Sequence, residues 1–165
     1  MNTLNELEDI LYFAYGSNLD ESDLLGWCSR HGLNYPLGEC LGRARLPDHE
    51  LAFDRYSSAR NGGVLDCRMS PGRSVEGALF VVLPGGWSVL DRKEGHPGAY
   101  VRRETSVVDQ AGNTVRVMTY FVAMPALPLV PPSRTYLDIV RKGLASRGIP
   151  ADELHRAVDA AKERR

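Results

Sequence analysis

Residues 12–19 read Tyr12-Phe13-Ala14-Tyr15-Gly16-Ser17-Asn18-Leu19, a stretch in which a short strand runs into a tight polar turn. The apolar and aromatic run from Ile10 to Ala14 predicts a buried strand. Glycine at the turn lets the backbone approach a ligand closely, and the successive backbone N–H groups of Gly16-Ser17-Asn18 can bind an anion. A well-packed strand-to-helix turn is the alternative interpretation. The turn is neither a phosphate loop nor a dinucleotide fingerprint, because it lacks the further glycines and the lysine of those motifs.

A second stretch, Leu90-Asp91-Arg92-Lys93-Glu94-Gly95, predicts the end of a short helix that begins after Pro84. Glu94 shares one helical face with Trp87, because the two residues are seven positions apart. That face would shelter the Glu94 carboxylate from water, and a partly desolvated carboxylate is suited to accept a proton and hand it on. The alternative is a solvated Glu94 paired with a neighbouring basic residue. Asp91 competes for the same role but more often would brace the helix end.

Strands dominate the middle of the chain and helices its end. We expect strands at 43–54 (broken by a turn at its proline), 64–69, 75–83, 100–108 and 114–122, helices at 20–25, 84–94, from 133 and after 150, and a loop at 26–38. Residues 1–165 are interpreted as a single domain, in which residues 1–9 are expected to be flexible. This order of elements favours the α+β class, with a mixed or mainly antiparallel sheet curled around a site.

Composition and charge argue against several classes of partner. The formal net charge is −1 and the basic residues are spread along the chain, so nothing indicates a surface for nucleic acid or for an anionic membrane. The longest apolar stretches, such as 78–84, are too short to cross a bilayer, and the acidic start of the chain is unlike a signal peptide. Cys28, Cys40 and Cys67 are widely spaced, which predicts unpaired thiols in a reducing cytoplasm and no metal site.

Three further side chains could carry chemistry. Tyr100 and Tyr136 offer hydroxyl groups at the start of a strand and of a helix, although a buried tyrosine with a satisfied hydroxyl is the usual case. Arg60, just before Gly62-Gly63, either covers a substrate or is a solvated loop residue. The chain has no Gly-x-Ser-x-Gly motif, which argues against a serine hydrolase.

Taken together, these motifs resemble those of the γ-glutamylcyclotransferase family, which is related to the AIG2-like proteins. The resemblance covers nearly the whole chain, and it is carried by Tyr12 to Leu19, Ala44-Arg45-Leu46, Gly62-Gly63, Ser70-Pro71-Gly72, Val75-Glu76-Gly77, Leu90-Asp91-x-x-Glu94-Gly95, Tyr100, and Pro131-Pro132-Ser133 with Tyr136. It implies a small barrel-like α+β fold with the site in its cavity, often in a homodimer, and no metal or organic cofactor.

The family reaction converts a γ-glutamyl amide into 5-oxoproline and a free amine, and the substrate's own α-amine is the nucleophile. By resemblance, Glu94 corresponds to the general acid/base and Tyr136 to a tyrosine that contacts substrate, with Tyr100 as a further contact. The segment that holds substrate corresponds to Tyr12, Phe13, Ala14, Tyr15, Gly16 and Ser17, followed by Asn18. We therefore expect a cytoplasmic enzyme that acts on a small γ-glutamyl amino acid or amine and uses neither nucleic acid nor membrane as a partner.

Two other functions stay open on the sequence. One is a pathway-dedicated cyclotransferase that removes a γ-glutamyl protecting group from a biosynthetic or catabolic amine. The other is a non-catalytic AIG2-like binding module, which the presence of Glu94 beside an intact Tyr15-Gly16-Ser17-Asn18 turn argues against. We expect the leaving amine to contact the loops at 26–38, 55–63 and 124–132.

Overall fold

The computed structural model describes residues 10–163, so the expectation for residues 1–9 lies outside the described part of the chain. Its elements are β1 (Leu11–Ala14), the 3-10 helix η1 (Ser17–Leu19), α1 (Glu21–Arg30), β2 (Leu37–Ser57), β3 (Gly62–Val82), α2 (Gly86–Glu94), β4 (Tyr100–Asp109), β5 (Thr114–Val122), α3 (Arg134–Ser146) and α4 (Asp152–Lys162). The α+β class is confirmed.

The five strands close into a barrel in the order β1-β3-β2-β4-β5. Two antiparallel hairpins, β2–β3 and β4–β5, form most of the wall. The short strand β1 lies antiparallel to β3 and parallel to β5, with Tyr12 opposite both Phe80 and Met118. The sheet is therefore mixed and mainly antiparallel, as expected, and inserting β1 pairs the edges that the two hairpins would otherwise leave open.

The β2–β3 hairpin corrects the expectation of shorter, separate strands. The expected breaks at Pro47 and at 70–72 are irregularities within two long strands, because Pro47 pairs with Ser74 while His49 pairs with Met69. The residues left over on β3 bulge outward, and the Gly72 N–H donates to Asp48 Oδ1 at 2.9 Å. A bulge absorbs turn-forming residues without ending the ladder, which is why local turn signals predicted a break that does not occur.

Helix α1 also differs from the expectation, because it continues to Arg30 instead of ending near residue 25. Leu24 and Cys28, one helical turn apart, are both buried, so packing extends the helix through the Gly26 that suggested a loop. The ends of α2 and α3 follow the sequence signals. Gly95 ends α2 in the left-handed region with φ of 67°, and the Ser133 side chain caps α3 by accepting from the Tyr136 N–H.

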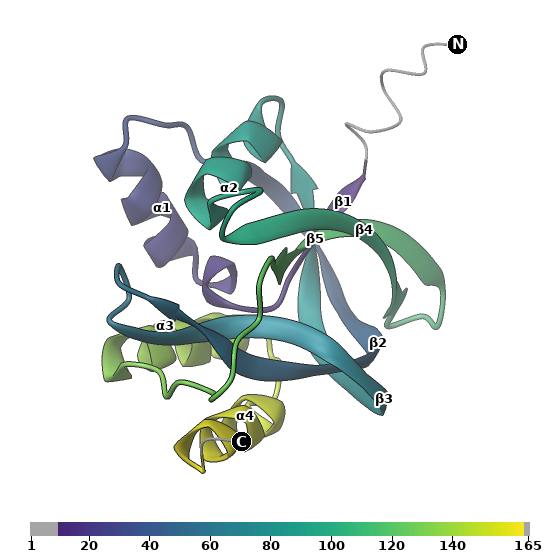
Figure 1. Cartoon of the computed structure of the whole chain (residues 1–165). Helices are drawn as coiled ribbons and strands as arrows, with labels where there is room; N and C mark the ends of the chain where they lie inside the picture. Colours follow the sequence, from purple (N-terminus) through teal and green to yellow (C-terminus); the bar gives the residue numbers. More distant parts are fainter. Residues whose placement is uncertain (1–9, 164–165) are drawn as a thin grey trace.

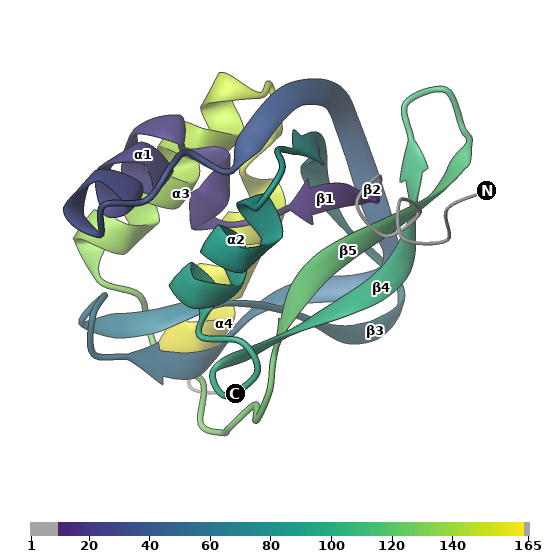
Figure 2. The same ribbon diagram turned by 90° about the horizontal axis from the view of Figure 1, so that it is seen from above.

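Helices α1 and α3 lie on one side of the barrel and the β4–β5 hairpin lies on the other, with α2 between them (Figure 1, Figure 2). In Figure 1 the turn of the β2–β3 hairpin lies between α1 and α3. Arg60 of this turn contacts Asp23 of α1, which joins the two elements directly. Within residues 10–163 no helix is long and apolar enough to cross a membrane.

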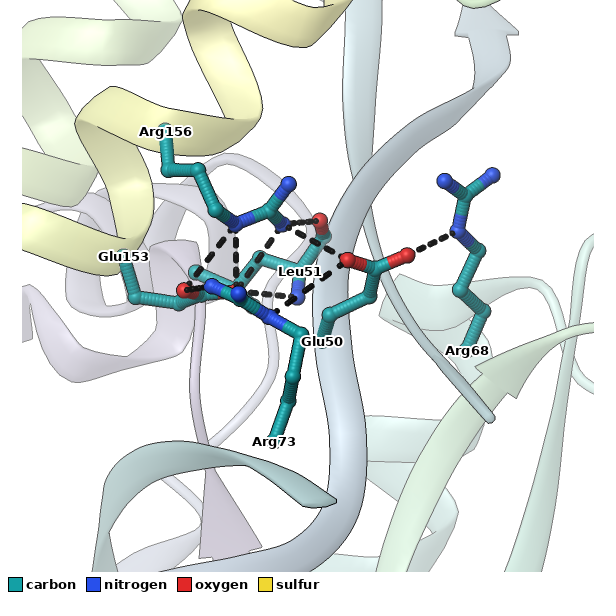
Figure 3. A network of polar contacts seen from close by, with 6 residues as sticks. All are labelled: Glu50, Leu51, Arg68, Arg73, Glu153 and Arg156. Carbon is teal, nitrogen blue, oxygen red and sulfur yellow. Dashed lines mark hydrogen bonds and ion pairs between the residues drawn. The ribbon is translucent and has the colours of Figure 1, made fainter. Parts of the chain in front are cut away.

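A network of charged side chains fastens α4 to the barrel (Figure 3). Glu153 of α4 accepts from the Leu51 N–H at 3.1 Å, and Arg156 donates to the Leu51 carbonyl at 2.8 Å. Arg156 also contacts Glu50 at 3.3 Å, which in turn accepts from Arg68 at 2.9 Å. These contacts fix the last helix against β2 and β3, away from the turn that follows β1.

Two buried carboxyl groups, Asp54 and Asp66, lie next to each other between β2 and β3, and each is 2% exposed. Asp66 accepts from the Val122 N–H at 3.0 Å. Among the described residues, no other residue's N–H group donates to the Asp54 carboxyl oxygens. Burial and the neighbouring Asp54 carboxyl raise the pKa of Asp66 to about 8, so the pair retains a proton at neutral pH.

As pH rises, the free energy of unfolding is expected to fall less in Asp66→Asn than in the native protein. The unfolded chain releases this proton near pH 4, whereas the folded chain releases it near pH 8. The contribution to the free energy of unfolding is therefore full below pH 4, falls as pH rises from 4 and is lost as pH passes through 8, by an amount on the order of 5 kcal/mol. Urea unfolding at pH 5, 7 and 9 measures the slope.

The matched control for that substitution is Asp159→Asn, which removes an exposed carboxylate from α4. The control should keep the wild-type dependence on pH. An unchanged pH slope in Asp66→Asn would contradict the shared proton.

Candidate active site

Helix α2 delivers Glu94 to the turn that follows β1. Glu94 is the last residue of the helix and is partly buried, and its Oε1 accepts from Asn18 Nδ2 at 2.7 Å. No donor in the described part of the chain is bonded to Oε2, so that oxygen is available to exchange a proton with a ligand. The acid and the turn, which are 76 positions apart in sequence, are thus joined by one hydrogen bond.

A cavity lies between Glu94 and the turn and has a volume of about 30 Å³. Its walls come from β1, the turn, β3, α2, β4, β5 and α3, and its lining residues are Tyr12, Tyr15, Gly16, Ser17, Asn18, Leu65, Glu94, Tyr100, Tyr120 and Tyr136. A larger outer pocket of about 270 Å³ shares Ser17, Glu94, Tyr100 and Tyr136 with it. Glu94 therefore lies where an enclosed space meets a more open one.

Asn18 holds the Glu94 carboxylate in place. The same Nδ2 that donates to Glu94 also donates to Tyr12 Oη at 2.9 Å, and Asn18 Oδ1 accepts from Lys93 Nζ at 2.7 Å. Asn18 is 4% exposed, so its amide has no competing water on most sides. Because three side chains satisfy both ends of one amide, Asn18 has a single hydrogen-bonding orientation.

A buried lysine connects this group to α1. The Lys93 side chain is 5% exposed, and its Nζ lies 3.7 Å from Asp23 Oδ2. Burial lowers the pKa of Lys93, while the charges of Glu94 and Asp23 act in the opposite direction. Asp23 in turn accepts two hydrogen bonds from Arg60, at 3.0 and 2.8 Å. Burial acts to raise the pKa of Asp23, but the Arg60 hydrogen bonds and the Lys93 charge outweigh it, and the net shift is downward.

The backbone of the turn presents donors to the cavity. Among the described residues, the N–H groups of Gly16, Ser17 and Asn18 donate to no other residue, whereas the Gly16 and Ser17 carbonyls accept from the Leu19 and Asp20 N–H groups. A Cβ on Gly16 would lie 3.8 Å from Tyr136 Oη, at ordinary van der Waals distance, so the Gly16 backbone lies close to this lining tyrosine. The arrangement suits an oxyanion or a carboxylate.

Two tyrosines that line the cavity are fixed by the same peptide segment. Leu65 N–H donates to Tyr136 Oη at 3.2 Å, and Tyr100 Oη donates to the Leu65 carbonyl at 2.7 Å. Burial raises the pKa of Tyr12 and of Tyr136, so both hydroxyl groups keep their protons. Tyr12 Oη and Tyr136 Oη each accept a hydrogen bond, which leaves their protons free to donate to a ligand.

The structure brings together most of the site residues expected from sequence, but it leaves two of them out. Phe13 and Ala14 are fully buried and do not line the cavity. Successive side chains alternate across a strand, so Phe13 faces away from the side on which Tyr12 lines the cavity. Asp91 braces the helix end, as expected, through two hydrogen bonds from Arg102 at 2.9 and 3.1 Å.

Three participants were missed in the sequence. Leu65 contributes mainly backbone groups, and Tyr120 lines the cavity while its Oη donates to Asp91 Oδ1 at 2.7 Å. Lys93 is one of the two basic neighbours, with Arg92, that a solvated Glu94 could pair with, and no role inside the protein was expected for it. No local signal identifies the first two, because their roles depend on barrel closure. The position of Lys93 directly before the acid was a usable signal, since a helix can turn adjacent residues toward different neighbours.

The arrangement can move a proton next to a carbonyl group. It offers one partly buried carboxylate, a set of backbone donors and two tyrosine hydroxyl groups around one small cavity. In residues 10–163 no group of three or more His, Cys, Asp or Glu side chains is placed to hold a metal ion.

Comparisons with other proteins agree with this arrangement. Residues 74–156 match the AIG2-like family. The chain is 33% identical over 150 residues to a γ-glutamylcyclotransferase of Bos taurus, an alignment that covers 88% of this chain and 75% of the relative. It is 32% identical over 150 residues to a γ-glutamylcyclotransferase of Homo sapiens, with the same coverage. A solved γ-glutamyl cyclotransferase superposes with a TM-score of 0.74 at 29% identity, covering 90% of this chain and 86% of that one.

The alignment extends over three quarters of the relatives' length, and the superposition covers 90% of this chain. Agreement of this extent in both sequence and fold is more than a shared architecture would produce. This chain belongs to the γ-glutamylcyclotransferase family.

Proposed function

We propose that this chain is a γ-glutamylcyclotransferase, an enzyme that converts a γ-glutamyl amino acid or γ-glutamyl amine into 5-oxoproline and the free amine. The observation that carries the proposal is the contact between Glu94 and Asn18 at the cavity, in a chain 33% identical to a named γ-glutamylcyclotransferase. The acid and the donor-rich turn are the two groups that the cyclisation requires.

The nucleophile is the α-amine of the substrate. This amine begins as an ammonium group with a pKa of about 8 and must lose a proton before it can attack. Glu94 accepts that proton, and the neutral amine adds to the γ-carbonyl carbon to close a five-membered ring. Glu94 then gives this proton to the departing nitrogen, and the carbon–nitrogen bond of the amide breaks. The restored Glu94 carboxylate takes the second proton that the new ring nitrogen must lose and passes it to the released amine, so that the products are 5-oxoproline, whose neutral amide nitrogen keeps one hydrogen, and the amine in its ammonium form.

The remaining residues orient the substrate and stabilise charge. The N–H groups of Gly16 and Ser17 either stabilise the carbonyl oxygen as it gains negative charge or hold the α-carboxylate. The hydroxyl groups of Tyr12 and Tyr136, which line the same cavity, donate further hydrogen bonds to the substrate. Holding the glutamyl chain folded back on itself is a further large effect, since oriented intramolecular reactions reach effective molarities of about 10⁵–10⁸ M.

The test is a panel of γ-glutamyl amides incubated with the purified protein, with 5-oxoproline and the released amine measured by mass spectrometry. We expect the two products in equal amounts from at least one γ-glutamyl amino acid or amine. A preference for one specialised amine would instead identify a pathway-dedicated enzyme. Absence of 5-oxoproline from every amide would favour the non-catalytic binding module and overturn the proposal.

A homodimer and a cytoplasmic location complete the proposal, and both rest on the sequence alone. Sedimentation of the purified chain measures the first. Fractionation of cells that express the tagged protein measures the second. A γ-glutamyl small molecule is the proposed partner, with neither nucleic acid nor membrane involved.

A further inference from the structure

The outer pocket extends from Glu94 toward α1 and the turn of the β2–β3 hairpin. Besides the residues that it shares with the inner cavity, it is lined by Trp27 and Arg30 of α1 and by Arg55, Ser57, Ala59 and Arg60 near the end of the hairpin. When the glutamyl unit of a substrate occupies the inner cavity, its leaving amine extends into the outer pocket. The reason is that Glu94, which lines both spaces, must reach the departing nitrogen.

The lining of the outer pocket is strongly cationic. Arg30, Arg55, Arg60 and Lys93 face it, whereas Glu94 is the only acid that lines it among the residues that the structure describes. Arg60 is paired with Asp23, and Lys93 donates to Asn18 beside the same Asp23. These two cations therefore have protein partners already.

Arg55 is different. It is partly buried, yet its guanidinium forms no hydrogen bond or ion pair with any other residue in the described range 10–163. The Arg55 charge also acts on Tyr100, which lines the inner cavity. Burial raises the pKa of Tyr100, and the positive charge of Arg55 opposes that rise. A partly desolvated guanidinium without an anionic partner is unfavourable, and a carboxylate is the group whose geometry it matches best.

We propose that Arg55 selects substrates whose leaving amine carries a free carboxylate, which means γ-glutamyl amino acids in preference to γ-glutamyl alkylamines. The α-carboxylate of a leaving amino acid is one carbon away from the departing nitrogen. With that nitrogen near Glu94, the carboxylate lies in the outer pocket, where Arg55 donates a pair of hydrogen bonds to it. Arg30 at the exposed rim adds positive charge that attracts the same group. This inference rests on the proposed cyclotransferase activity.

The experiment compares two substrates that differ in one charge, γ-glutamyl-alanine and γ-glutamyl-alaninamide. The native protein is expected to prefer γ-glutamyl-alanine by about 10- to 100-fold in kcat/KM, the range that a hydrogen-bonded charged group provides. Arg55→Gln should reduce this preference to about threefold, mainly through a higher KM for γ-glutamyl-alanine. The alaninamide should be processed at nearly the native rate. Arg55→Lys should restore part of the preference.

Arg103→Gln is the matched control, because Arg103 is an exposed arginine of β4 outside the outer pocket. It should leave the preference unchanged. Equal losses for both substrates in Arg55→Gln would mean that Arg55 holds the glutamyl unit itself, which overturns the inference. A native protein that processes both substrates equally well also overturns it, without any variant. Both outcomes leave the cyclotransferase activity intact, whereas absence of 5-oxoproline from every amide would instead remove the proposed function.

Discussion

Glu94→Gln is expected to lower kcat for 5-oxoproline formation by about 10³-fold or more, while the melting temperature stays within a few degrees of the native value. The amide keeps the size of the carboxylate and an oxygen that can accept from Asn18 at the present 2.7 Å. It cannot accept a proton from the substrate ammonium, and general acid/base catalysis contributes about 10²–10⁴-fold to such reactions. Because Glu94 both accepts and returns a proton, its substitution removes two proton transfers. The expected loss of kcat therefore lies in the upper part of that range.

The measurement is single-substrate kinetics with mass-spectrometric detection of 5-oxoproline, together with thermal unfolding of both proteins. Glu39→Gln serves as the control, because Glu39 is an exposed carboxylate on β2 and does not line the cavity. Its kinetics should match those of the native protein. A folded Glu94→Gln protein with native kcat would exclude Glu94 as the proton carrier.

Asn18→Asp is expected to lower kcat at neutral pH by about 10²-fold, with a smaller effect on KM. The substitution preserves shape and an oxygen for Lys93, but it removes the N–H donors to Glu94 and Tyr12. It also places a second carboxylate at hydrogen-bond distance from the first. Two carboxylates at such a short distance share one proton, so the Glu94 carboxylate becomes a poor proton acceptor near pH 7.

A shift in the pH profile separates this role from simple structural damage. In Asn18→Asp the pH at which kcat reaches half its maximum should move upward, because the shared proton must leave before Glu94 can act. Asn34→Asp adds the same charge to an exposed position outside the inner cavity and should change neither kcat nor the profile. An Asn18→Asp protein with a native pH profile would show that Asn18 does not orient Glu94.

The local elements were largely readable from the sequence. Four features depend on neighbouring residues and lie where expected: the strand at 11–14, the end of α2 at Gly95, the β4–β5 hairpin and the start of α3 after Ser133. The errors occurred where packing overrides a local signal. Helix α1 continues past Gly26 because Leu24 and Cys28 are buried, and β3 continues past Pro71 because its register with β2 resumes beyond the bulge.

The site itself was predicted only in part. Glu94 and the turn at 16–18 were identified because an acid on an apolar helix face and a donor-rich turn are local patterns. The contact between them was not readable from periodicity, since it joins residues 76 positions apart. Phe13 and Ala14 were expected to hold substrate because they lie within the motif, whereas the alternation of β1 directs only some of its side chains to the cavity.

By itself the sequence determined the α+β class, the acid at the end of α2 and the turn after β1, since these depend on interactions within a few residues. The tertiary structure alone decided that β1 closes the barrel between β3 and β5 and that Lys93 and Asn18 orient Glu94. It also decided that Arg55 faces the outer pocket without a partner among the described residues. The physical reason is that hydrogen bonds and burial across a closed barrel depend on strand register and on the packing of distant segments. No local pattern specifies either of these.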